Sequence, residues 1–319
     1  MPNNAGQPSA LDDSTTVSVV IPTIGRPELA RAIASAKAQQ TDAVVEVVVV
    51  YDGPEDAVPE AAQAADVVLA TGGGARGSAA RNRGVASSAG RLVAFLDDDD
   101  EWLPTKLRDQ LALLDGSSDA GSIVVAGRHV HVDARTGDVS EAGPTRLIRE
   151  DESVEEYLFR RRPPHGGRPS MYTSTLLCSR ELALAVPWDE TLPRHQDWDW
   201  LVRLGRRPGV VFRQPEPALV RIQTGSDQSI SASAHWRPSL SWADGALRDS
   251  PAVYADFIAA QTLRYALQAR DWKGVATVAR ALWRARRLPS LQPMIIGVAG
   301  LLPRRTIERI TSRTVRRQP

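Results

Sequence analysis

The sequence predicts an α/β protein with a mostly parallel central sheet flanked by helices and with a helical extension at the C-terminus. Short runs rich in valine, leucine and isoleucine recur along the first half of the chain, helical stretches lie between them, and Ala-rich segments dominate the last quarter. With 42% hydrophobic and 24% charged residues, the 319-residue chain has an ordinary globular composition, which excludes disorder of the whole.

Five apolar, β-branched runs are expected to be strands buried on both faces, at residues 17–21, 44–50, 66–70, 91–96 and 122–126. Between them, apolar residues recur at helical spacing, which predicts helices at residues 26–40, 78–89 and 103–114. Strands that alternate with helices in this way form a parallel sheet.

Beyond residue 130 this alternation weakens. A basic stretch rich in proline and glycine at 160–170 is expected to be an acceptor-side loop, and MYTSTLLC at 171–178 is expected to be a strand. Farther on, Ala-rich segments at 252–269 and 273–287 are separated by a short break, which predicts a helical hairpin.

The nearly balanced total of 39 basic and 38 acidic residues gives no support to a nucleic-acid partner, but the charges are unevenly distributed. From Gln261 onward there are 13 basic and 2 acidic residues, and these flank an apolar stretch at 288–303. At 16 residues with three prolines, that stretch is shorter than the roughly 20 residues that cross a bilayer. The pattern fits peripheral contact with an anionic membrane, and a solvated basic tail or an oligomer contact remains an alternative.

The single cysteine, Cys178, cannot form an internal disulfide, and we expect it to be a packing residue. The N-terminus has neither the basic start nor the apolar run of a signal peptide. Both features predict a cytoplasmic location, with the peripheral membrane contact as an option at the inner face.

An acidic run, DDDDE at 97–101, directly follows the expected strand at 91–96. Ligand sites of open α/β sheets lie beyond the carboxyl ends of the strands, and carboxylates packed this closely repel one another unless a hard cation neutralises them. We therefore expect Mg²⁺ or Mn²⁺ here. The alternative is a solvated loop whose last acids favour the N-terminus of the next helix.

Two further features belong to the same region. Asp52 ends the second expected strand and could hold a base or ribose, although an Asp-Gly pair after a strand is more often a turn. TGGGARG at 71–77 satisfies G-x-G-x-x-G, but the dinucleotide fingerprint belongs after the first strand, which disfavours a dehydrogenase. A glycine loop without a ligand, and a loop whose amides, Arg76 and Arg81 approach a phosphate, both remain open.

RHQDWDWLVRL at 194–204 has helical spacing, with Asp197 near its start. An acid in a first helical turn is commonly a capping partner, but an Asp among tryptophans and basic residues is also suited to act as a general base on a hydroxyl. His129 and His131 alternate on an expected strand, yet the five histidines form no metal motif, and no G-x-S-x-G elbow is present.

In order along the chain, four motifs resemble those of the family 2 glycosyltransferases, which have the GT-A fold and use nucleotide-activated sugars. VSVVIPTIGRPE resembles the opening strand and turn, and VVVVYDGPED the second-strand motif. GSAARNRG with RLVAFLDDDDEW resembles the middle signature, and HQDWDWLVRL the catalytic helix. The resemblance covers residues 17–225.

This resemblance implies roles for individual residues. Asp197 matches the catalytic base, and Asp99 and then Asp100 are the implied ligands of a divalent cation, Mn²⁺ or Mg²⁺. Asp97 and Asp99 form the D-x-D element around the ribose and the metal-bound diphosphate. The residues implied to bind the nucleotide sugar are Pro22, Thr23, Arg26, Asp52, Arg76, Arg81, Asn82, Asp97 and Asp98.

The chain also departs from the family pattern. Tyr51 and Pro54 occupy the first and last positions of a motif that usually reads Asp-Asp-Gly-Ser. Gln196 stands where a Glu often precedes the catalytic Asp, and Gln223 stands where a His often occurs.

The implied function is metal-dependent transfer of a sugar from a UDP-, GDP- or dTDP-sugar to a hydroxyl of a glycan, lipid-linked or small-molecule acceptor, by a single displacement that inverts configuration. The expected division is a flexible lead at 1–16, a nucleotide-sugar-binding part at 17–130, an acceptor-binding and catalytic part at 131–245 and a basic helical extension at 246–319. A sugar-phosphate nucleotidyltransferase and a non-catalytic, membrane-associated sugar-nucleotide-binding protein remain the alternatives.

Overall fold

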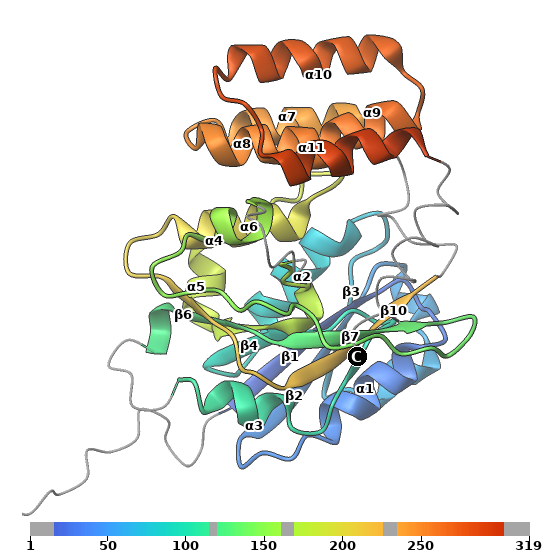
Figure 1. The fold of residues 1–319 in the computed structure, drawn as a ribbon. Coiled ribbons are helices and arrows are strands. Elements are labelled where there is room, and N and C mark those ends of the chain that lie inside the picture. Colours follow the sequence, from blue (N-terminus) through green and yellow to red (C-terminus); the bar gives the residue numbers. More distant parts are fainter. Residues whose placement is uncertain (1–15, 115–119, 161–168, 226–234, 303–319) are drawn as a thin grey trace, which may run out of the picture.

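The computed structural model describes residues 16–114, 120–160, 169–225 and 235–302. A seven-stranded sheet carries helices on both faces, and the helices that follow residue 235 form a further layer at the top of Figure 1. Most of the expected lead at 1–16, most of the basic stretch at 160–170 and the arginines after residue 303 lie outside the described residues.

The parallel part of the sheet contains β1 (Thr16–Thr23), β2 (Val44–Tyr51), β3 (Val67–Ala70) and β4 (Leu92–Phe95). The helices between and after these strands are α1 (Leu29–Lys37), α2 (Arg76–Ser87) and α3 (Lys106–Leu111). Short 3-10 turns connect some of the elements, at η1 (Glu55–Ala57), η2 (Glu60–Ala64) and η3 (Ala120–Ser122). These strands and helices confirm the alternation expected from the sequence.

β1 shows why the first strands are continuously apolar. Val19 and Ile21 belong to a core cluster with Leu29 of α1, whereas Val20 belongs to a different cluster with Val85 of α2. Successive side chains of a strand point to opposite faces, so helices on both faces demand apolar residues at every position. β1 lies between β2 and β4, which places their carboxyl ends side by side.

The remaining strands of the large sheet are β6 (Ile123–Ala126), β8 (Leu176–Ser179) and β9 (Val211–Arg213). The order is β3-β2-β1-β4-β8-β6-β9, with β8 antiparallel to both of its neighbours. A second, three-stranded sheet contains β5 (Glu101–Trp102), β10 (Ala218–Thr224) and β7 (Arg128–Asp133). Strands from both sides of residue 130 therefore share one sheet.

The strand expected at 171–178 was wrong in its first part. Residues Thr173–Thr175 form a 3-10 turn, η4, and the strand begins only at Leu176. Hydroxyl side chains bind groups outside a strand ladder here: Thr175 Oγ1 donates to the nearby Tyr172 carbonyl at 2.7 Å, and Ser174 Oγ donates to the distant Asp100 at 2.5 Å. Such side-chain bonds compete with a strand ladder.

Three helices, α4 (Val154–Phe159), α5 (Arg180–Ala185) and α6 (Gln196–Gly205), contribute to the same core cluster as α2. The C-terminal layer contains α7 (Trp236–Ala246), α8 (Pro251–Phe257), the π-helical segment η6 (Ile258–Leu263), α9 (Arg264–Gln268), α10 (Trp272–Arg284), α11 (Leu291–Val298) and the 3-10 turn η7 (Ala299–Leu301).

The predicted helical hairpin is confirmed. Arg270 has a positive φ of 52°, and Asp271 caps α10 by accepting a hydrogen bond from the Gly274 amide at 2.9 Å. The predicted α/β class with a C-terminal helical extension is confirmed as well. Among the described helices, none has both the length and the apolar character needed to cross a bilayer.

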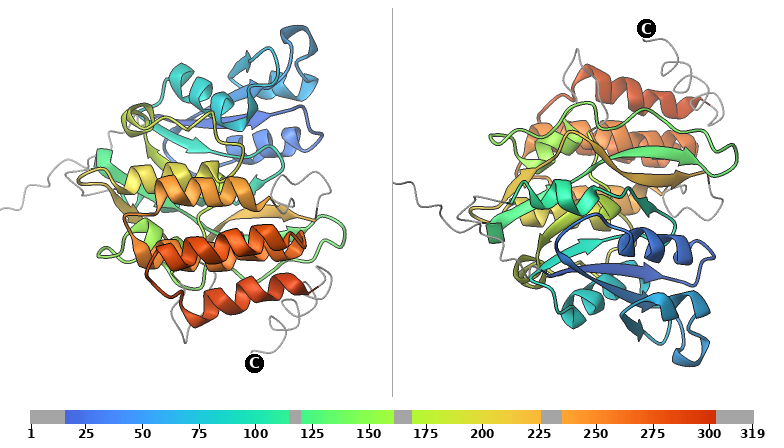
Figure 2. Two further views of the ribbon diagram at one scale, coloured as in Figure 1. Left: turned by 90° about the horizontal axis from the view of Figure 1, so that it is seen from above. Right: turned by 90° about the horizontal axis from the view of Figure 1, so that it is seen from below.

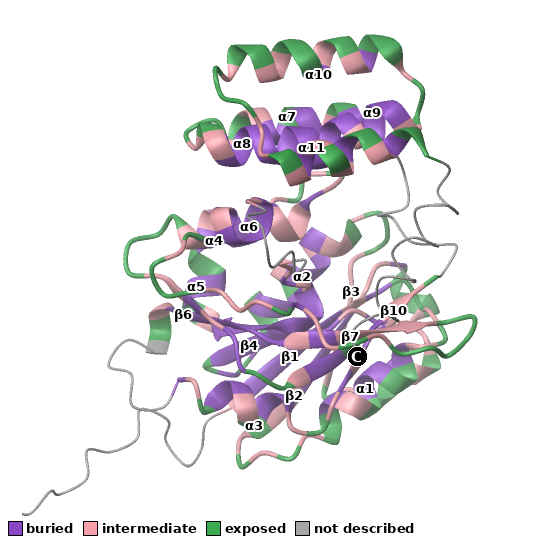
Figure 3. Cartoon of the chain, in the orientation of Figure 1, coloured by how far each residue is buried: buried purple, intermediate pink, exposed green. Residues whose placement is uncertain are grey.

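One apolar core joins the sheet to the C-terminal layer (Figure 3). Trp200 of α6 stacks on Trp188 with ring centroids 4.4 Å apart, and Phe95 of β4 meets both rings edge-on. Trp242 of α7 meets Phe257 of α8 at 5.1 Å within the same cluster. Cys178 is fully buried in β8, and burial raises the pKa of its thiol to about 12, in keeping with a packing role.

Candidate active site

The residues predicted to form a site gather where β1, β2 and β4 end. At the end of β1, Thr23 is buried and its hydroxyl donates to Asp98 at 2.6 Å. Arg26, at the start of the following turn, forms ion pairs with Asp98 at 2.8 Å and with Asp99 at 3.0 Å. Pro22 is half-buried in the last part of β1. The opening motif therefore contacts the acidic run directly.

The four aspartates of this run have different surroundings. Asp98 is almost fully buried and is bound to Thr23 and Arg26. Asp97 pairs with Arg81 of α2 at 2.5 Å. The Asp99 side chain is 29% exposed, and its pKa is raised to about 6, first by burial and then by repulsion from Asp97, against the opposing effect of Arg26.

Asp100 faces the protein interior. Ser174 Oγ donates to one of its oxygens at 2.5 Å, and the amide of Gln223 on β10 donates to the other at 2.9 Å. Burial and then Asp97 raise its pKa well above the ordinary value. Both oxygens already accept bonds from the protein, so the geometry favours Asp99 over Asp100 as a ligand for a cation. The metal roles of both remain predictions.

Asp52, at the end of β2, organises the glycine loop. Its carboxylate accepts hydrogen bonds from Thr71 Oγ1 at 2.6 Å, from the Ala75 amide at 2.9 Å and from the Arg76 amide at 2.8 Å. Burial alone would raise the pKa of Asp52, but these hydrogen bonds lower it. Two amides at the start of α2 thus bind Asp52, which argues against their use for a phosphate, one of the options that the sequence left open.

The glycines of this loop serve the backbone conformation. Gly72, Gly73 and Gly74 have φ values of 90°, 101° and 76°, which side chains with a Cβ rarely adopt. A Cβ at Gly72 or Gly74 would meet no atom within 4 Å, so packing does not require glycine there. These φ values turn the chain so that the amides of Ala75 and Arg76, which follow the glycines, reach Asp52.

On α2, three predicted donor-binding residues have unequal positions. Arg76 is exposed, and Arg81 is buried between Asp97 and the ring of Trp188, 4.9 Å from its guanidinium carbon. Asn82 instead holds the chain before α6: its amide nitrogen donates to the Trp188 carbonyl at 2.9 Å, and its oxygen accepts from the Trp188 amide at 2.8 Å. Asn82 therefore has a structural task beside any contact with a donor.

Asp197 lies in the first turn of α6. Two residues earlier, His195 adopts a left-handed backbone conformation with φ 61°. Its buried ring stacks on Trp198 with ring centroids 4.7 Å apart and forms a hydrogen bond of 2.5 Å with Ser239 of α7. Burial, with a smaller effect of Arg194, lowers the pKa of His195 to about 3, so its ring is neutral. These contacts fix the turn that carries Asp197.

The electrostatic surroundings of Asp197 connect it to the acidic run. Burial raises its pKa, the Trp198 amide and Arg81 oppose the rise, and Asp97 adds to it. α6 also approaches α2 directly, because a Cβ at Gly77 would lie 2.9 Å from Arg81 Nη1 and 3.8 Å from Gln196 Oε1. Arg81 is therefore shared between the acidic run and the start of α6.

Sequence reasoning missed some residues that shape this site. Ser174 accepts a hydrogen bond from the Asp97 amide at 3.0 Å and donates one to Asp100. The one sequence signal for this role is that a polar residue stands in a segment expected to be a buried strand. The ring of Tyr51, noted as a departure from the family motif, lies beside Gly53, where a Cβ would collide with it. A Cβ at Gly25 would lie 3.5 Å from the same ring. Tyr51 thus covers the edge where Asp52 lies.

Within the described residues, no three His, Cys, Asp or Glu side chains form a ready-made metal cage. The acidic run nevertheless fits a divalent cation that takes most of its ligands from a bound diphosphate, because Mg²⁺ is commonly held by one or two carboxylates together with substrate phosphates. Among the described residues, Arg26 and Arg81 form the ion pairs of this run, and burial, followed by repulsion from Asp97, raises the pKa of Asp99.

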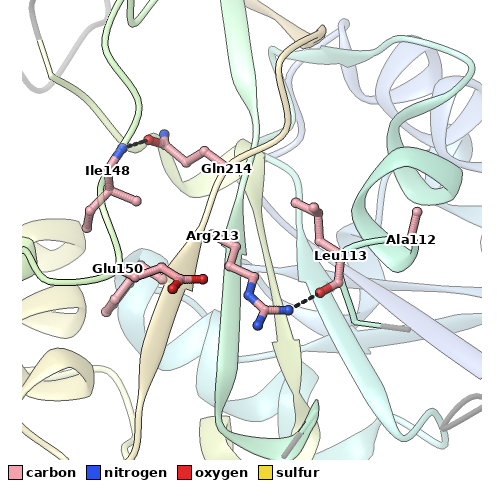
Figure 4. A pocket seen from close by; sticks show the side chains of 7 residues that line it. Ala112, Leu113, Ile148, Glu150, Arg213 and Gln214 are labelled. Carbon is pink, nitrogen blue, oxygen red and sulfur yellow. Dashed lines mark hydrogen bonds between the residues drawn. The ribbon is translucent and has the colours of Figure 1, made fainter. Parts of the chain in front are cut away.

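Two other features lie apart from this edge. His129 and His131 share a face of β7 as expected, with rings 4.9 Å apart. A shallow pocket borders the edge strand β9, where Arg213 donates to the Leu113 carbonyl at 2.6 Å and Gln214 accepts from the Ile148 amide at 2.9 Å (Figure 4). Two strands, β8 and β6, separate β9 from β4, so this pocket is not part of the site.

The family model described as Glycosyl transferase family 2 matches residues 18–173, which include Asp52 and the acidic run at 97–101 but not Asp197. Residues 18–173 belong to glycosyltransferase family 2. The amylovoran biosynthesis glycosyltransferase AmsB of Erwinia amylovora is 37% identical over 130 residues, which are 40% of this chain and 40% of AmsB. This chain therefore matches less than half of the length of AmsB.

Solved structures of TarS from S. aureus have a similar fold. TarS 1-349 in complex with UDP-GlcNAc has a TM-score of 0.58 at 15% identity, and the match covers 85% of this chain and 81% of that one. A longer TarS structure has a TM-score of 0.55 at 14% identity, covering 94% of this chain and 55% of that one. This likeness confirms the GT-A-type fold of the family 2 chain.

Proposed function

We propose that the chain transfers a sugar from a nucleotide-sugar donor to an acceptor hydroxyl, with help from Mn²⁺ or Mg²⁺ and with Asp197 as the base. One observation carries the proposal: Arg81 pairs with Asp97 at 2.5 Å, and a Cβ at Gly77 would lie 2.9 Å from Arg81 Nη1 and 3.8 Å from Oε1 of Gln196, the residue before Asp197. The donor-side acids and the start of the helix that carries the proposed base therefore meet at one buried arginine. A donor held by the acids would have its sugar close to the group that activates the acceptor.

On the donor side, the end of β2 and the glycine loop are expected to receive the nucleoside. Asp52 keeps this loop in one conformation through three hydrogen bonds, which reduces the ordering that binding would require. Asp97 and Asp99 would hold a divalent cation with the diphosphate. When bound, that cation would supply charge stabilisation for the departing diphosphate.

On the acceptor side, Asp197 would take the proton of the attacking hydroxyl. Burial raises its pKa, which makes the carboxylate a stronger base, while the Trp198 amide and then Arg81 oppose the rise. As the hydroxyl oxygen bonds to the anomeric carbon, the bond to the diphosphate oxygen breaks on the opposite face. A single displacement of this kind inverts the configuration of the sugar.

The donor class follows by comparison. TarS structures contain UDP-GlcNAc in one case and UDP in another, which makes a uridine nucleotide sugar the first donor to test, ahead of GDP- and dTDP-sugars. AmsB is described as a biosynthetic glycosyltransferase, and we propose a biosynthetic role with a glycan, lipid-linked or small-molecule acceptor for this chain as well.

The test is a panel of UDP-, GDP- and dTDP-sugars incubated with the full chain and Mn²⁺ or Mg²⁺, without an acceptor. We expect slow, metal-stimulated release of a nucleoside diphosphate from one donor class. Early NMR spectra of the released sugar should show the anomer opposite to that of the donor. Absence of binding and hydrolysis across the panel would reject the proposal, and retained configuration would reject the single displacement.

The alternative enzyme makes a different prediction. A nucleotidyltransferase would combine a nucleoside triphosphate with a sugar phosphate and release pyrophosphate, so the same preparation is assayed for pyrophosphate. Asp138→Asn, at an exposed position on the turn after β7, serves as the control variant for both assays and should behave as the wild type.

A further inference from the structure

The large apolar side chains that remain exposed are concentrated at one end of the molecule. Of the twelve found among the described residues, eight lie between Trp272 and Leu302. This segment forms α10, α11 and the connection between them, on the outer side of the C-terminal layer (Figure 2). Soluble surfaces rarely gather so many apolar side chains in one short segment, and such gatherings mark interaction sites.

α11 has small residues on its buried face and large apolar residues on its exposed face. Pro293 and Gly297 are buried, and a Cβ at Gly297 would collide with the Ala259 carbonyl of η6. On the opposite face, Leu291, Ile295 and Val298 are 75%, 59% and 48% exposed. Their spacing of four and three residues places them on one stripe of the helix. The stripe therefore does not serve the core of this chain.

α10 contributes exposed tryptophans. Trp272 and Trp283 are 65% and 86% exposed, and their separation of eleven residues, close to three helical turns, places them on the same side of the helix. The buried side of α10 is formed by Gly274 and Val278 instead. Leu288, in the connection to α11, is 91% exposed. Tryptophan is a residue that is favoured at the boundary between lipid and water.

The charges of this segment are all positive. Residues 272–302 contain no Asp or Glu, and their basic side chains are all exposed: Lys273, Arg280, Arg284, Arg286 and Arg287. If two copies of the chain met through this face in a symmetric dimer, these charges would oppose one another. An anionic surface would attract them instead. Basic residues beside exposed tryptophan and aliphatic side chains are the composition of helices that lie on membranes.

We propose that α10 and α11, which we call the docking hairpin, bind the surface of a bilayer that contains anionic lipid. The apolar stripe of α11, Leu288 and the α10 tryptophans would enter the boundary between headgroups and acyl chains. The arginines would lie at the level of the lipid phosphates. At 13 and 8 residues, the helices would lie along the bilayer rather than cross it. This inference concerns a different surface from the proposed active site and does not depend on it.

The test is co-sedimentation of the full chain with vesicles of phosphatidylcholine alone or with 30% phosphatidylglycerol, at about physiological salt. We expect partitioning to the anionic vesicles only. The variant Leu291→Ser, Ile295→Ser, Val298→Ser should lower it about 100-fold, because three apolar side chains no longer enter the lipid. Replacing Arg280 and Arg284 with Gln should lower it about 25-fold, at about fivefold for each charge.

Matched controls keep the test specific. Val44→Ser, Val139→Ser, Leu184→Ser removes three exposed apolar side chains from the sheet-containing part of the protein, and replacing Arg91 and Arg207 with Gln removes two exposed charges there. Both controls should bind as the wild type does. All variants change exposed side chains, and thermal melts verify that each one is folded.

Three results would overturn the proposal. The first is absence of wild-type binding to anionic vesicles. The second is unchanged binding by the serine variant, which would assign the interaction to basic residues elsewhere, including those after residue 303. The third is concentration-dependent self-association, measured by analytical ultracentrifugation, that the serine variant abolishes while vesicle binding is absent. That last result would make the docking hairpin a protein contact.

Discussion

Replacement of Asp52 by alanine tests whether this carboxylate acts by holding the glycine loop. The change removes the acceptor of three hydrogen bonds, at 2.6, 2.8 and 2.9 Å, two of them from amides at the start of α2. Loss of a comparable helix-capping side chain costs about 1–2 kcal/mol. Because Asp52 is only half-buried, water can satisfy the freed donors in part, and we expect a loss of about 2 kcal/mol in unfolding free energy.

The expected loss corresponds to a decrease in Tm of about 4–8 °C, as domains of 150–250 residues lose about 2–4 °C per kcal/mol. The loop should also become less ordered, so the Kd of the donor should rise about tenfold, the equivalent of about 1.4 kcal/mol. Thermal melts and calorimetric titration with the preferred nucleotide sugar measure the two effects on the same preparation.

Asp66→Ala is the matched control. Asp66 precedes β3, at the opposite end of the sheet from Asp52, and it accepts a hydrogen bond from the Val47 amide at 2.7 Å and pairs with Lys37 at 2.8 Å. Its loss should reduce stability without changing donor affinity. An Asp52→Ala variant with unchanged Tm, or an Asp66→Ala variant with an equal loss of donor affinity, would refute the reasoning.

The pKa of Asp52 predicts how the loss of stability in Asp52→Ala depends on pH. Despite its burial, hydrogen bonds lower the folded-state pKa of Asp52 below the ordinary value of 3.8. Its stabilising contribution is therefore complete above about pH 4 and is lost as the pH falls through the lower, folded-state pKa. The difference in stability between wild type and Asp52→Ala should persist at neutral pH and shrink in acid.

Two further predictions concern packing and a buried charge. Gly84→Ala should destabilise the protein by about 1–3 kcal/mol in urea unfolding, because the new Cβ would collide with Val20 of β1. Gly245→Ala is the control: its Cβ would meet no atom within 4 Å, so it should be neutral or stabilising. Equal effects of the two changes would contradict the packing of α2 on β1. Lys106 is fully buried, and desolvation lowers its pKa well below 10.5, so the unfolded state binds more protons between the folded-state pKa and 10.5. In that range wild-type stability should rise with pH by about 1 kcal/mol per unit more than that of Lys106→Met. Parallel pH profiles of the two proteins would show that Lys106 is charged in the fold.

The strands of the parallel part could be predicted because burial on both faces leaves a continuous apolar run, as in β2. Their order could not, since it depends on pairing between distant segments: β8, from residues 176–179, lies antiparallel between β4 and β6. The turn at Thr173–Thr175 was hidden for a similar reason. Ser174 binds Asp100, 74 residues away, and no local pattern announces that bond.

The candidate site was predictable as a set of positions but not as a set of contacts. Carboxylates after β2 and β4 were expected at one edge because parallel strands end together, and the structure brings Asp52 and the acidic run to that edge. The sequence did not indicate that Asp52 binds the start of α2, or that Asn82 holds Trp188. Such side-chain assignments depend on distances that only the folded chain defines.

The C-terminal extension illustrates the same limit. Its hairpin and basic character could be read from composition, but the inverted polarity of α11 could not. Gly297 and Gly300 pack against the backbone of η6 and α9, since a Cβ at Gly300 would lie 2.6 Å from the Arg264 carbonyl. Small residues are therefore required inside, and Leu291 and Ile295 are left outside.

The most direct test of the proposed division of labour is calorimetric titration of the preferred nucleotide sugar, with and without Mn²⁺, combined with turnover on the same samples. Asp99→Asn should lose the increase in donor affinity that Mn²⁺ gives. Asp197→Asn should keep wild-type donor affinity and lose turnover by about 100-fold or more, the usual effect of removing a general base. Mn²⁺-dependent binding that survives in Asp99→Asn, or near-normal turnover by Asp197→Asn, would contradict the account.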